Sequence, residues 1–379
     1  MMEMTRHYTK ISPIKSCFIA IAVGLNVMLA MATVFSAYGG MIDPDEMVFA
    51  SIVAMMLPGF LIAGVVMLLL DLMFWRRLSL VLLLGWVVSG PAIIEYMPMH
   101  LFTRKLTEQE KKRTFTFLTY NVLHFWDFRG DVPGLEKNMT LDYILSTDVD
   151  IVSLQEAESI QGPWKVTPEQ LYELHTRYPY GYLNAAKQLT LLSKYPAEHV
   201  HLDLPPCIAQ RVACFRLDVK GDTINLFNVH LESIGLSPAD KELYMQLYHP
   251  SADRKLKEEL SEVKSQLISK LSAAYRERAE QARALRECID SVGGNVIVAG
   301  DFNDIPGCYA IRTIAGDDME NAFTRCGFGP SITYHGNRFY FRIDHVLYRG
   351  NFEAVDIERA RIPSSDHYPL LTTFLIDEP

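Results

Sequence analysis

The stretch Val296-Ile-Val-Ala-Gly-Asp-Phe-Asn-Asp304 decides the fold. Its first four residues are apolar and rich in β-branched side chains, which predicts a short buried strand. A glycine and a cluster of polar residues then end the strand. Because side chains alternate along an extended chain, Asp301 and Asn303 share one face. The segment therefore predicts a buried strand that brings a carboxylate and an amide to the edge of a sheet.

Apolar runs of this kind recur throughout the chain after residue 114. They span residues 115–120, 151–154, 189–192, 212–217, 224–229, 296–299, 343–348 and 370–375. Stretches with helical character, such as 141–146 and 168–177, lie between some of them. Short strands with interspersed helices predict an α/β domain with one large core.

The residues at or near the ends of these runs are mostly carboxylates, amides and imidazoles, the groups from which sites at strand ends are built. They are Asn121, Gln155-Glu156, His230-Leu-Glu232, Asp301 with Asn303, Asp344-His345 and Asp366-His367. Taken singly, each is a common turn or cap residue, but six such groups in one domain favour a site. Asn and Glu oxygens without Cys suit a hard cation such as Mg²⁺. A His oriented by an Asp can deprotonate water, and a second His with an amide can hold phosphoryl oxygens. The set therefore suits hydrolysis of a phosphate ester.

Six segments resemble, in order, the motifs of the endonuclease/exonuclease/phosphatase superfamily. They are Thr119-Tyr-Asn121-Val, Leu154-Gln-Glu156, Asn228-Val-His230-Leu-Glu, Gly300-Asp-Phe-Asn303-Asp, Arg342-Ile-Asp344-His and Ser365-Asp-His367-Tyr-Pro. Leu192-Ser-Lys-Tyr-Pro196 is also similar to a segment of that superfamily. The resemblance covers residues 114–379 and implies a four-layer α/β sandwich, in which two packed mixed β-sheets are flanked by helices. It also implies a metal-dependent phosphoesterase.

The resemblance implies a metal site built from oxygen ligands. Glu156 would be the main ligand of Mg²⁺, and Asn121 would help to hold the ion. Asp366 would lie near the metal. Mn²⁺ would be a possible substitute for Mg²⁺.

The resemblance also implies a catalytic set. Asp344 and His367 would form an Asp–His pair, in which His367 acts on water or stabilises the phosphate. Asp301 would serve as acid or base near the scissile bond. Asn303 and His230 would hold phosphoryl oxygens. Because the superfamily supports more than one assignment, Asp301 and His367 both stay open as the group that activates water.

A long segment, at about 240–290, separates the His230 and Asp301 motifs, where simpler superfamily members are shorter. No Pro or Gly occurs from Asp253 to Ile289, and the apolar residues fall on one helix face, so the segment predicts a long helix. Two interpretations stay open. The helix is an arm packed on the sheet or kinked, or it serves dimerisation or faces the membrane.

Residues near the expected site leave the substrate open. Lys187, Lys194 and Arg211 could contact phosphate or be ordinary surface charge. The site-facing aromatic residue of the superfamily has no clear counterpart, and Tyr182 is the candidate. Residues 187–190 stand where a glycine-rich segment is expected before Leu192. The sequence therefore leaves the substrate specificity of this region undecided.

The first hundred residues contain three long apolar runs without Asp, Glu, Lys or Arg. The first lies between Lys15 and Asp43, the second between Glu46 and Asp71, and the third between Arg77 and Glu95. A membrane span needs about 20 apolar residues, so these runs predict transmembrane helices. The expected division is a membrane anchor at 1–104 with helices at about 16–38, 47–70 and 78–100, a basic linker at 105–113, and a catalytic domain at 114–379.

The basic residues around the spans predict their orientation. Arg6, Lys10 and Lys15 precede the first span, and Arg76-Arg77 lies between the second and third. This distribution places the N-terminus inside and the catalytic domain outside the cytoplasm. The five basic residues after the third span count against it, but the first helix usually dominates. We expect an integral protein of a bacterial inner or plasma membrane.

The charge of the expected catalytic domain bears on its substrate. Residues 114–379 contain 26 basic and 37 acidic residues, a net charge of −11. Bulk attraction of nucleic acid is therefore not expected. Nucleic acid and a phospholipid headgroup or small phosphate ester stay open as substrates. The alternative function is a non-catalytic, membrane-anchored binding or assembly module with the same fold.

Overall fold

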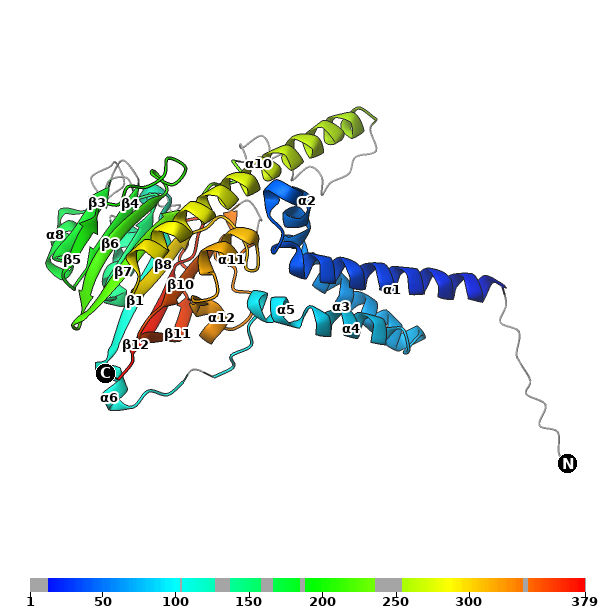
Figure 1. The fold of residues 1–379 in the computed structure, drawn as a ribbon, viewed down its shortest axis with the longest axis horizontal. Coiled ribbons are helices and arrows are strands. Elements are labelled where there is room, and N and C mark those ends of the chain that lie inside the picture. The colour runs from blue at the N-terminus through cyan, green and yellow to red at the C-terminus, as the bar shows by residue number, and fades with distance from the viewer. Residues whose placement is uncertain are drawn as a thin grey trace.

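The chain folds into a set of N-terminal helices and an α/β domain that pack against each other (Figure 1). The structure is a computed structural model. It describes residues 13–102, 104–126, 137–157, 166–184, 188–235, 254–336 and 340–378.

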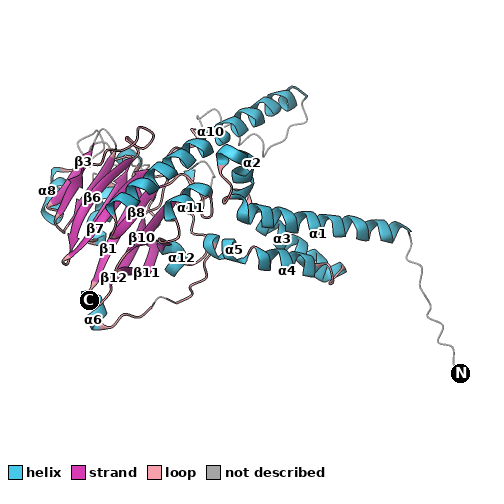
Figure 2. Cartoon of the chain, viewed as in Figure 1, coloured by secondary structure: helices cyan, strands magenta, loops and turns pink. Residues whose placement is uncertain are grey.

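The strands of the described residues form two six-stranded mixed sheets, each with one parallel pair at its centre (Figure 2). The first sheet contains, in spatial order, β11 (Phe352–Arg359), β12 (Leu370–Ile376), β1 (Thr114–Asn121), β2 (Ile151–Gln155), β4 (Leu189–Ser193) and β3 (Tyr180–Asn184). The second contains β5 (Ala197–Val200), β6 (Val212–Val219), β7 (Asp222–His230), β8 (Asn295–Asp301), β10 (Asp344–Arg349) and β9 (Glu320–Asn321). The parallel pairs are β1 with β2 and β7 with β8.

Helices cover the outer face of each sheet. A core of aromatic and aliphatic residues, including Phe117 and Phe215, fills the space between the sheets. Apolar side chains of α7 (Met139–Thr147) and α8 (Pro168–Arg177) pack on the first sheet. Those of α10 (Arg254–Val292) and α11 (Tyr309–Ala315) pack on the second. The order helix, sheet, sheet, helix confirms the expected four-layer sandwich. The remaining short helices are η1 (Leu123–Phe125), α6 (Glu108–Lys112) and α12 (Ala322–Cys326).

A buried polar contact joins the two sheets near one edge. The Nε2 of Gln155, at the end of β2, donates to Oδ1 of Asn228 in β7 at 2.7 Å. The Nδ2 of Asn228 donates in turn to the carbonyl of Leu154 at 2.9 Å. Because buried polar groups are costly unless they are paired, this bridge favours one alignment of the two sheets.

The N-terminal helices are α1 (Pro13–Gly39), α2 (Pro44–Ala54), α3 (Leu57–Phe74), α4 (Ser79–Val88) and α5 (Gly90–Tyr96). Within the described residues, two helical segments, Ser16–Gly39 and Leu57–Phe74, are long and apolar enough to cross a membrane. Together α4 and α5 would make a third span, with a bend of 71° between them.

The second and third apolar runs are interrupted where single helices are expected. The run at 47–70 is divided between α2 and α3, and Pro58 lies in the first turn of α3. The run at 78–100 is divided before Gly90-Pro91. Proline lacks an N–H group and is best tolerated in the first turn of a helix, so a new helix begins at each site. As a result, α2 packs beside α10 rather than extending the α3 span (Figure 1).

Ion pairs attach the N-terminal helices to the α/β domain. Arg283 of α10 contacts Asp43 Oδ2 at 2.7 Å and Asp45 Oδ2 at 2.8 Å, both at the start of α2. Arg312 of α11 contacts Glu95 of α5 at 2.9 Å. These contacts connect α2 and α5 to α10 and α11, the outer layer of the second sheet.

Apolar packing continues across the same junction. Leu57 and Tyr96 of the N-terminal helices share a buried cluster with Ile305, Cys308 and Ile343 of the α/β domain. The two parts therefore share a hydrophobic core, in which the N-terminal helices pack directly on the α/β domain.

The long helix α10 is held to the domain by a buried cation. Its C-terminal half packs on the second sheet, in agreement with the first of the two interpretations. Arg278 is fully buried, and its Nε lies 3.4 Å from Asp304 Oδ2. Its Nη1 donates to the carbonyl of Glu232 at 3.0 Å, and its guanidinium lies over the ring of Tyr275.

We expect Arg278→Met to lower the free energy of unfolding by about 3 kcal/mol, because Asp304 would be left buried without its cation. Thermal unfolding of the full chain measures the loss. The matched control is Arg276→Met, which changes an exposed arginine of the same helix. Equal unfolding temperatures for the two variants would contradict a structural role for the Arg278–Asp304 pair.

Candidate functional site

Strand topology gathers the motif residues at one edge of the sandwich. Asn121 ends β1 opposite Gln155 in β2, and His230 ends β7 opposite Asp301 in β8. Because both pairs are parallel, their carboxyl ends meet at the same edge. Asp344 opens β10, which is antiparallel to β8, and lies opposite Asp301. Five of the six motifs therefore converge for topological reasons.

The last motif reaches this edge beside the first sheet. His367 precedes β12, which is antiparallel to β1, and the register pairs Leu370 with Thr119. The hydroxyl of Ser365 donates to the carbonyl of Asn121 at 2.8 Å. This contact ties the His367 segment to the end of β1.

Gly300 permits the close approach that positions Asp301. Its φ is +144°, and a Cβ atom at this position would lie 2.0 Å from the carbonyl oxygen of Val229. Any other residue would therefore force β7 and β8 apart just before His230 and Asp301.

Asp344 and His367 form a buried pair. Nδ1 of His367 lies 2.9 Å from Oδ2 of Asp344, and its Nε2 lies 3.6 Å from Oδ2 of Asp301. Burial opposes the charged imidazolium, but the carboxylates of Asp344 and Asp301 outweigh it and raise the pKa of His367 to about 10. His367 is therefore an imidazolium at neutral pH in this environment.

Asp301 lies at the centre of the cluster. Its Oδ1 accepts a hydrogen bond from the backbone N–H of Asn303 at 2.8 Å, and its Oδ2 accepts one from Nδ2 of Asn121 at 3.1 Å. Burial raises the pKa of Asp301; His367 and His230 oppose this rise and Asp344 adds to it. A carboxyl with a raised pKa is suited to exchange protons near neutral pH.

Glu156 faces the cavity beside Asp301. Its Oε1 accepts a hydrogen bond from Nδ2 of Asn121 at 3.1 Å and lies 3.8 Å from Nε2 of His230. Its side chain keeps 20% of its surface exposed, whereas that of Asp301 keeps 2%. Asp366 lines the same cavity, and burial, with Glu156 and Asp301 nearby, raises its pKa although His367 opposes this. Glu156 is thus much more open to a ligand than Asp301.

The cluster has the donor set of a divalent cation site. Four carboxylates, those of Glu156, Asp301, Asp344 and Asp366, line or adjoin one cavity. Among the described residues, Asp344 Oδ1 is buried and has no hydrogen-bond partner. Asp301, Asp344 and His367 each offer a ligand atom, and these atoms lie within 4.8 Å of one another. Among the described residues that line the cavity there is no lysine. Carboxylate oxygens are the ligands that Mg²⁺ or Mn²⁺ prefers, so the residues fit such an ion.

A left-handed turn follows Asn121 at the rim of the cavity. Leu123, His124 and Phe125 have φ values of 43°, 55° and 59°. Such conformations are costly for residues other than glycine and concentrate at functional sites. The turn places Nε2 of His124 3.5 Å from Oε2 of Glu156. Sequence reasoning missed His124, and its position three residues after Asn121 was the only available signal.

The cavity at this edge has a volume of about 470 Å³. Its polar lining comes from Glu156, Arg211, His230, Asp301, Asn303, Asp366 and His367, with Arg278 and Asp304 deeper. Asn121 and Asp344 support this lining through their contacts with Asp301, Glu156 and His367. All eight expected site residues therefore lie in or against one cavity.

The three basic residues near the expected site have different positions. Arg211 lines the cavity and forms an ion pair with Glu232. Lys194 does not reach it: it follows β4, which is antiparallel to β2, so it lies at the opposite edge and contacts Asp148 at 2.9 Å. Of the two interpretations left open for Lys194, its position supports the ordinary surface charge, and the sequence could not decide because it does not reveal strand direction. Lys187 lies outside the described residues.

The aromatic neighbour of the site is Tyr334, not Tyr182. Tyr182 packs between the sheets against Phe215, and its hydroxyl donates to the carbonyl of Ala197. The ring of Tyr334 lies 4.9 Å from that of His367. No sequence motif marks Tyr334, which joins the site through a bridge to His367.

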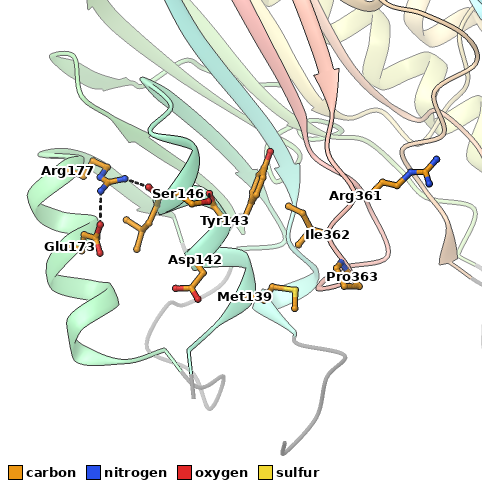
Figure 3. Close-up of a pocket in the computed structure, with 10 residues that line it drawn as sticks. Met139, Asp142, Tyr143, Ser146, Glu173, Arg177, Arg361, Ile362 and Pro363 are labelled. Carbon is orange, nitrogen blue, oxygen red and sulfur yellow. Dashed lines mark hydrogen bonds and ion pairs between the residues drawn. The ribbon is translucent and has the colours of Figure 1, made fainter. Parts of the chain in front are cut away.

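A second hollow, of about 760 Å³, lies between α7, α8 and residues 361–363 (Figure 3). Glu173 and Arg177 form an ion pair of 2.6 Å on its wall. None of its lining residues belongs to the motif set, so the chemistry is concentrated in the first cavity.

Solved structures with a similar fold cover most of the chain. An endonuclease/exonuclease/phosphatase protein of Bacteroides vulgatus is 17% identical, with a TM-score of 0.44 and coverage of 70% of this chain and 99% of that one. A humanised TDP2 of D. rerio is 15% identical, with a TM-score of 0.44 and coverage of 69% and 99%. A mannosyl-6-phosphatase of Bacteroides thetaiotaomicron is 16% identical, with a TM-score of 0.41 and coverage of 69% and 100%. No curated protein matches the chain.

Two family models match the sequence. A domain of unknown function, DUF8431, matches residues 18–96, the N-terminal helices. The model described as the endonuclease/exonuclease/phosphatase family matches residues 118–367, which contain all eight expected site residues. The chain belongs to the endonuclease/exonuclease/phosphatase family.

Proposed function

We propose that this protein is a membrane-anchored, divalent-metal-dependent phosphoesterase that cleaves a phosphodiester or phosphomonoester by in-line attack of water. The observation that carries the proposal is the convergence of Glu156, Asp301 and the Asp344–His367 pair in one cavity. An assembly module would have no need for buried carboxylates this close together, because their mutual repulsion opposes folding.

We assign the metal to Glu156, helped by Asn121 and Asp366. Nδ1 of His367 is already hydrogen-bonded to Asp344, so the buried Asp301–Asp344–His367 group acts better as a proton-handling unit. Glu156 opens onto the cavity, where an ion could keep several waters, as Mg²⁺ requires. A bound Mg²⁺ supplies positive charge that stabilises the phosphoryl oxygens.

Of the two groups left open by the sequence, Asp301 is the better candidate to take the proton of the attacking water. Its raised pKa brings it closer to the working pH, whereas His367, paired with Asp344, stays protonated. Nε2–H of the His367 imidazolium would donate to a phosphoryl oxygen. His230 would donate to the phosphate as well. One hydrogen of the Asn303 amide is used by the carbonyl of Leu231, and the second is available for the phosphate.

The arrangement of the helices supports a catalytic domain outside the cytoplasm. The connection between α3 and α4, which contains Arg76 and Arg77, and the start of α1 lie at the end far from the domain (Figure 1). Basic flanks favour the cytoplasmic side, so the domain would lie on the other side of the membrane.

Removing the metal tests the proposal. We expect the full chain in detergent with Mg²⁺ or Mn²⁺ to cleave bis(p-nitrophenyl) phosphate or p-nitrophenyl phosphate. Chelation with EDTA should lower the rate by about 1,000-fold, because the metal contributes several kcal/mol to the transition state. Release of p-nitrophenolate measures the rate, and added Mg²⁺ should restore it. An EDTA-resistant rate would contradict the metal assignment, and no cleavage of either ester would contradict the proposed function.

A further inference from the structure

The catalytic cavity has an apolar end as well as a polar end. Its apolar lining includes Met55, Leu267, Leu271, Ile305, Phe341 and Ile343. A site for a small, fully polar phosphate ester has no use for such a surface, because apolar walls do not replace the lost hydration of a polar ligand.

The apolar end is built partly from the membrane anchor. Met55 lies between α2 and α3, and the apolar span Leu57–Phe74 begins two residues later. Leu267 and Leu271 come from α10, which packs beside α2. The cavity therefore opens next to the end of a candidate membrane span. Met56, at the same place in the chain, has 49% of its surface exposed.

The apolar wall is continuous with the catalytic residues. Ile343 immediately precedes Asp344, and it shares a buried cluster with Leu57 at the start of α3. Tyr334 packs against this cluster while its ring contacts that of His367. One surface thus extends from the anchor to the Asp344–His367 pair.

The charged lining does not favour a nucleic acid. Among the described residues that line the cavity, the two arginines are both engaged, Arg211 with Glu232 and Arg278 with Asp304. Binding of a nucleic-acid backbone rests on cations that are available for successive phosphates. Residues 114–379 carry a net charge of −11, which adds to the mismatch.

We propose that the substrate is a membrane-borne amphiphile, a phosphate ester with an alkyl or acyl chain. The phosphate would lie at the polar end, beside Asp301 and His367, and the first part of the chain would lie along Met55, Leu267 and Leu271. This inference rests on the proposed function. It gives the anchor a second role, since the anchor both places the enzyme at its substrate and forms part of the binding surface.

A homologous series of substrates tests the inference. Methyl, hexyl and dodecyl p-nitrophenyl phosphodiesters share one reacting group and differ only in chain length. The full chain is assayed with Mg²⁺ in mixed micelles at a constant mole fraction of ester. Each fully buried methylene adds at most about fourfold, so partial burial predicts a kcat/KM about 100-fold higher for the dodecyl than for the methyl ester.

Matched variants distinguish binding of the alkyl chain by the cavity from partition of the ester into micelles. Met55→Gln and Leu267→Gln should each lower the dodecyl-to-methyl ratio of kcat/KM by about tenfold. Met56→Gln makes the same change at the neighbouring, half-exposed residue, which does not line the cavity, and should keep the wild-type ratio. Equal unfolding temperatures establish that each variant is folded.

The possible results have distinct meanings. Cleavage of the methyl ester without a chain-length preference would overturn the inference and leave the proposed function standing. An unchanged dodecyl-to-methyl ratio of kcat/KM in both folded variants, Met55→Gln and Leu267→Gln, would also overturn the inference and leave the proposed function standing. Cleavage of single-stranded DNA with a higher kcat/KM than the dodecyl ester would overturn it in favour of a nuclease. No cleavage of any ester or DNA would overturn the proposed function and the inference together.

Discussion

Replacing Glu156 with Gln is expected to lower kcat/KM for a phosphodiester by about 1,000-fold at a fixed, low Mg²⁺ concentration. The side chain keeps its size but loses the charge that faces the cavity between Asn121 and His230. If Glu156 is the main metal ligand, the Mg²⁺ concentration that gives half-maximal rate should rise steeply. Rates measured over a Mg²⁺ titration separate weaker metal binding from slower chemistry.

The control for this variant is Glu173→Gln. Glu173 lies on the wall of the second hollow, where it pairs with Arg177, and contacts none of the motif residues (Figure 3). Its replacement should leave the Mg²⁺ titration unchanged. A wild-type titration for Glu156→Gln would remove Glu156 from the metal site and favour the buried Asp301–Asp344–His367 group instead.

Replacing Asp344 with Asn is expected to lower kcat by about 100- to 10,000-fold at saturating Mg²⁺, the range typical of groups that position or charge a catalytic histidine. The 2.9 Å contact with His367 Nδ1 would persist, but its negative charge would be lost. Since the carboxylate favours the imidazolium, its removal lowers the pKa of His367 from about 10. The alkaline limb of the pH–rate profile should therefore move to lower pH.

Two measurements distinguish this result from general damage. The Mg²⁺ concentration for half-maximal rate should change less than in Glu156→Gln, because Asp344 lies behind His367 rather than on the cavity wall. Asp142→Asn, at an exposed carboxylate of the second hollow, serves as the control. A kcat for Asp344→Asn within a few-fold of this control would contradict the role of the Asp344–His367 pair.

Much of the fold was predictable because strand signals are local. The stretch 296–304 indicates a buried strand with polar residues at its end, and β8 covers Asn295–Asp301. The six motifs flank their strands closely enough that resemblance identified the four-layer sandwich, and the structure brings Asn121, Glu156 and Asp301 into contact. Residue type and alternation along one strand carried this information.

Other features depend on the direction and packing of elements that are distant in the sequence. Lys194 lies at the far edge because β4 is antiparallel to β2, and no local pattern reveals strand direction. Tyr334 reaches His367 through a bridge between two loops. The breaks in the second and third apolar runs were visible as Pro58 and Pro91, but hydropathy alone does not show whether a proline kinks a span or ends it.

The sequence by itself determined that carboxylates, amides and imidazoles flank the buried strands, because polar residues stand where each apolar run begins or ends. Only the tertiary structure decided that these residues meet at one edge and what surrounds them, because both depend on strand direction and packing. Met55, Leu267 and Ile343 come from three distant segments and meet only because α2 packs between α1 and α10. Burial of apolar surface drives that packing, and it depends on the shapes of the assembled elements rather than on any local pattern.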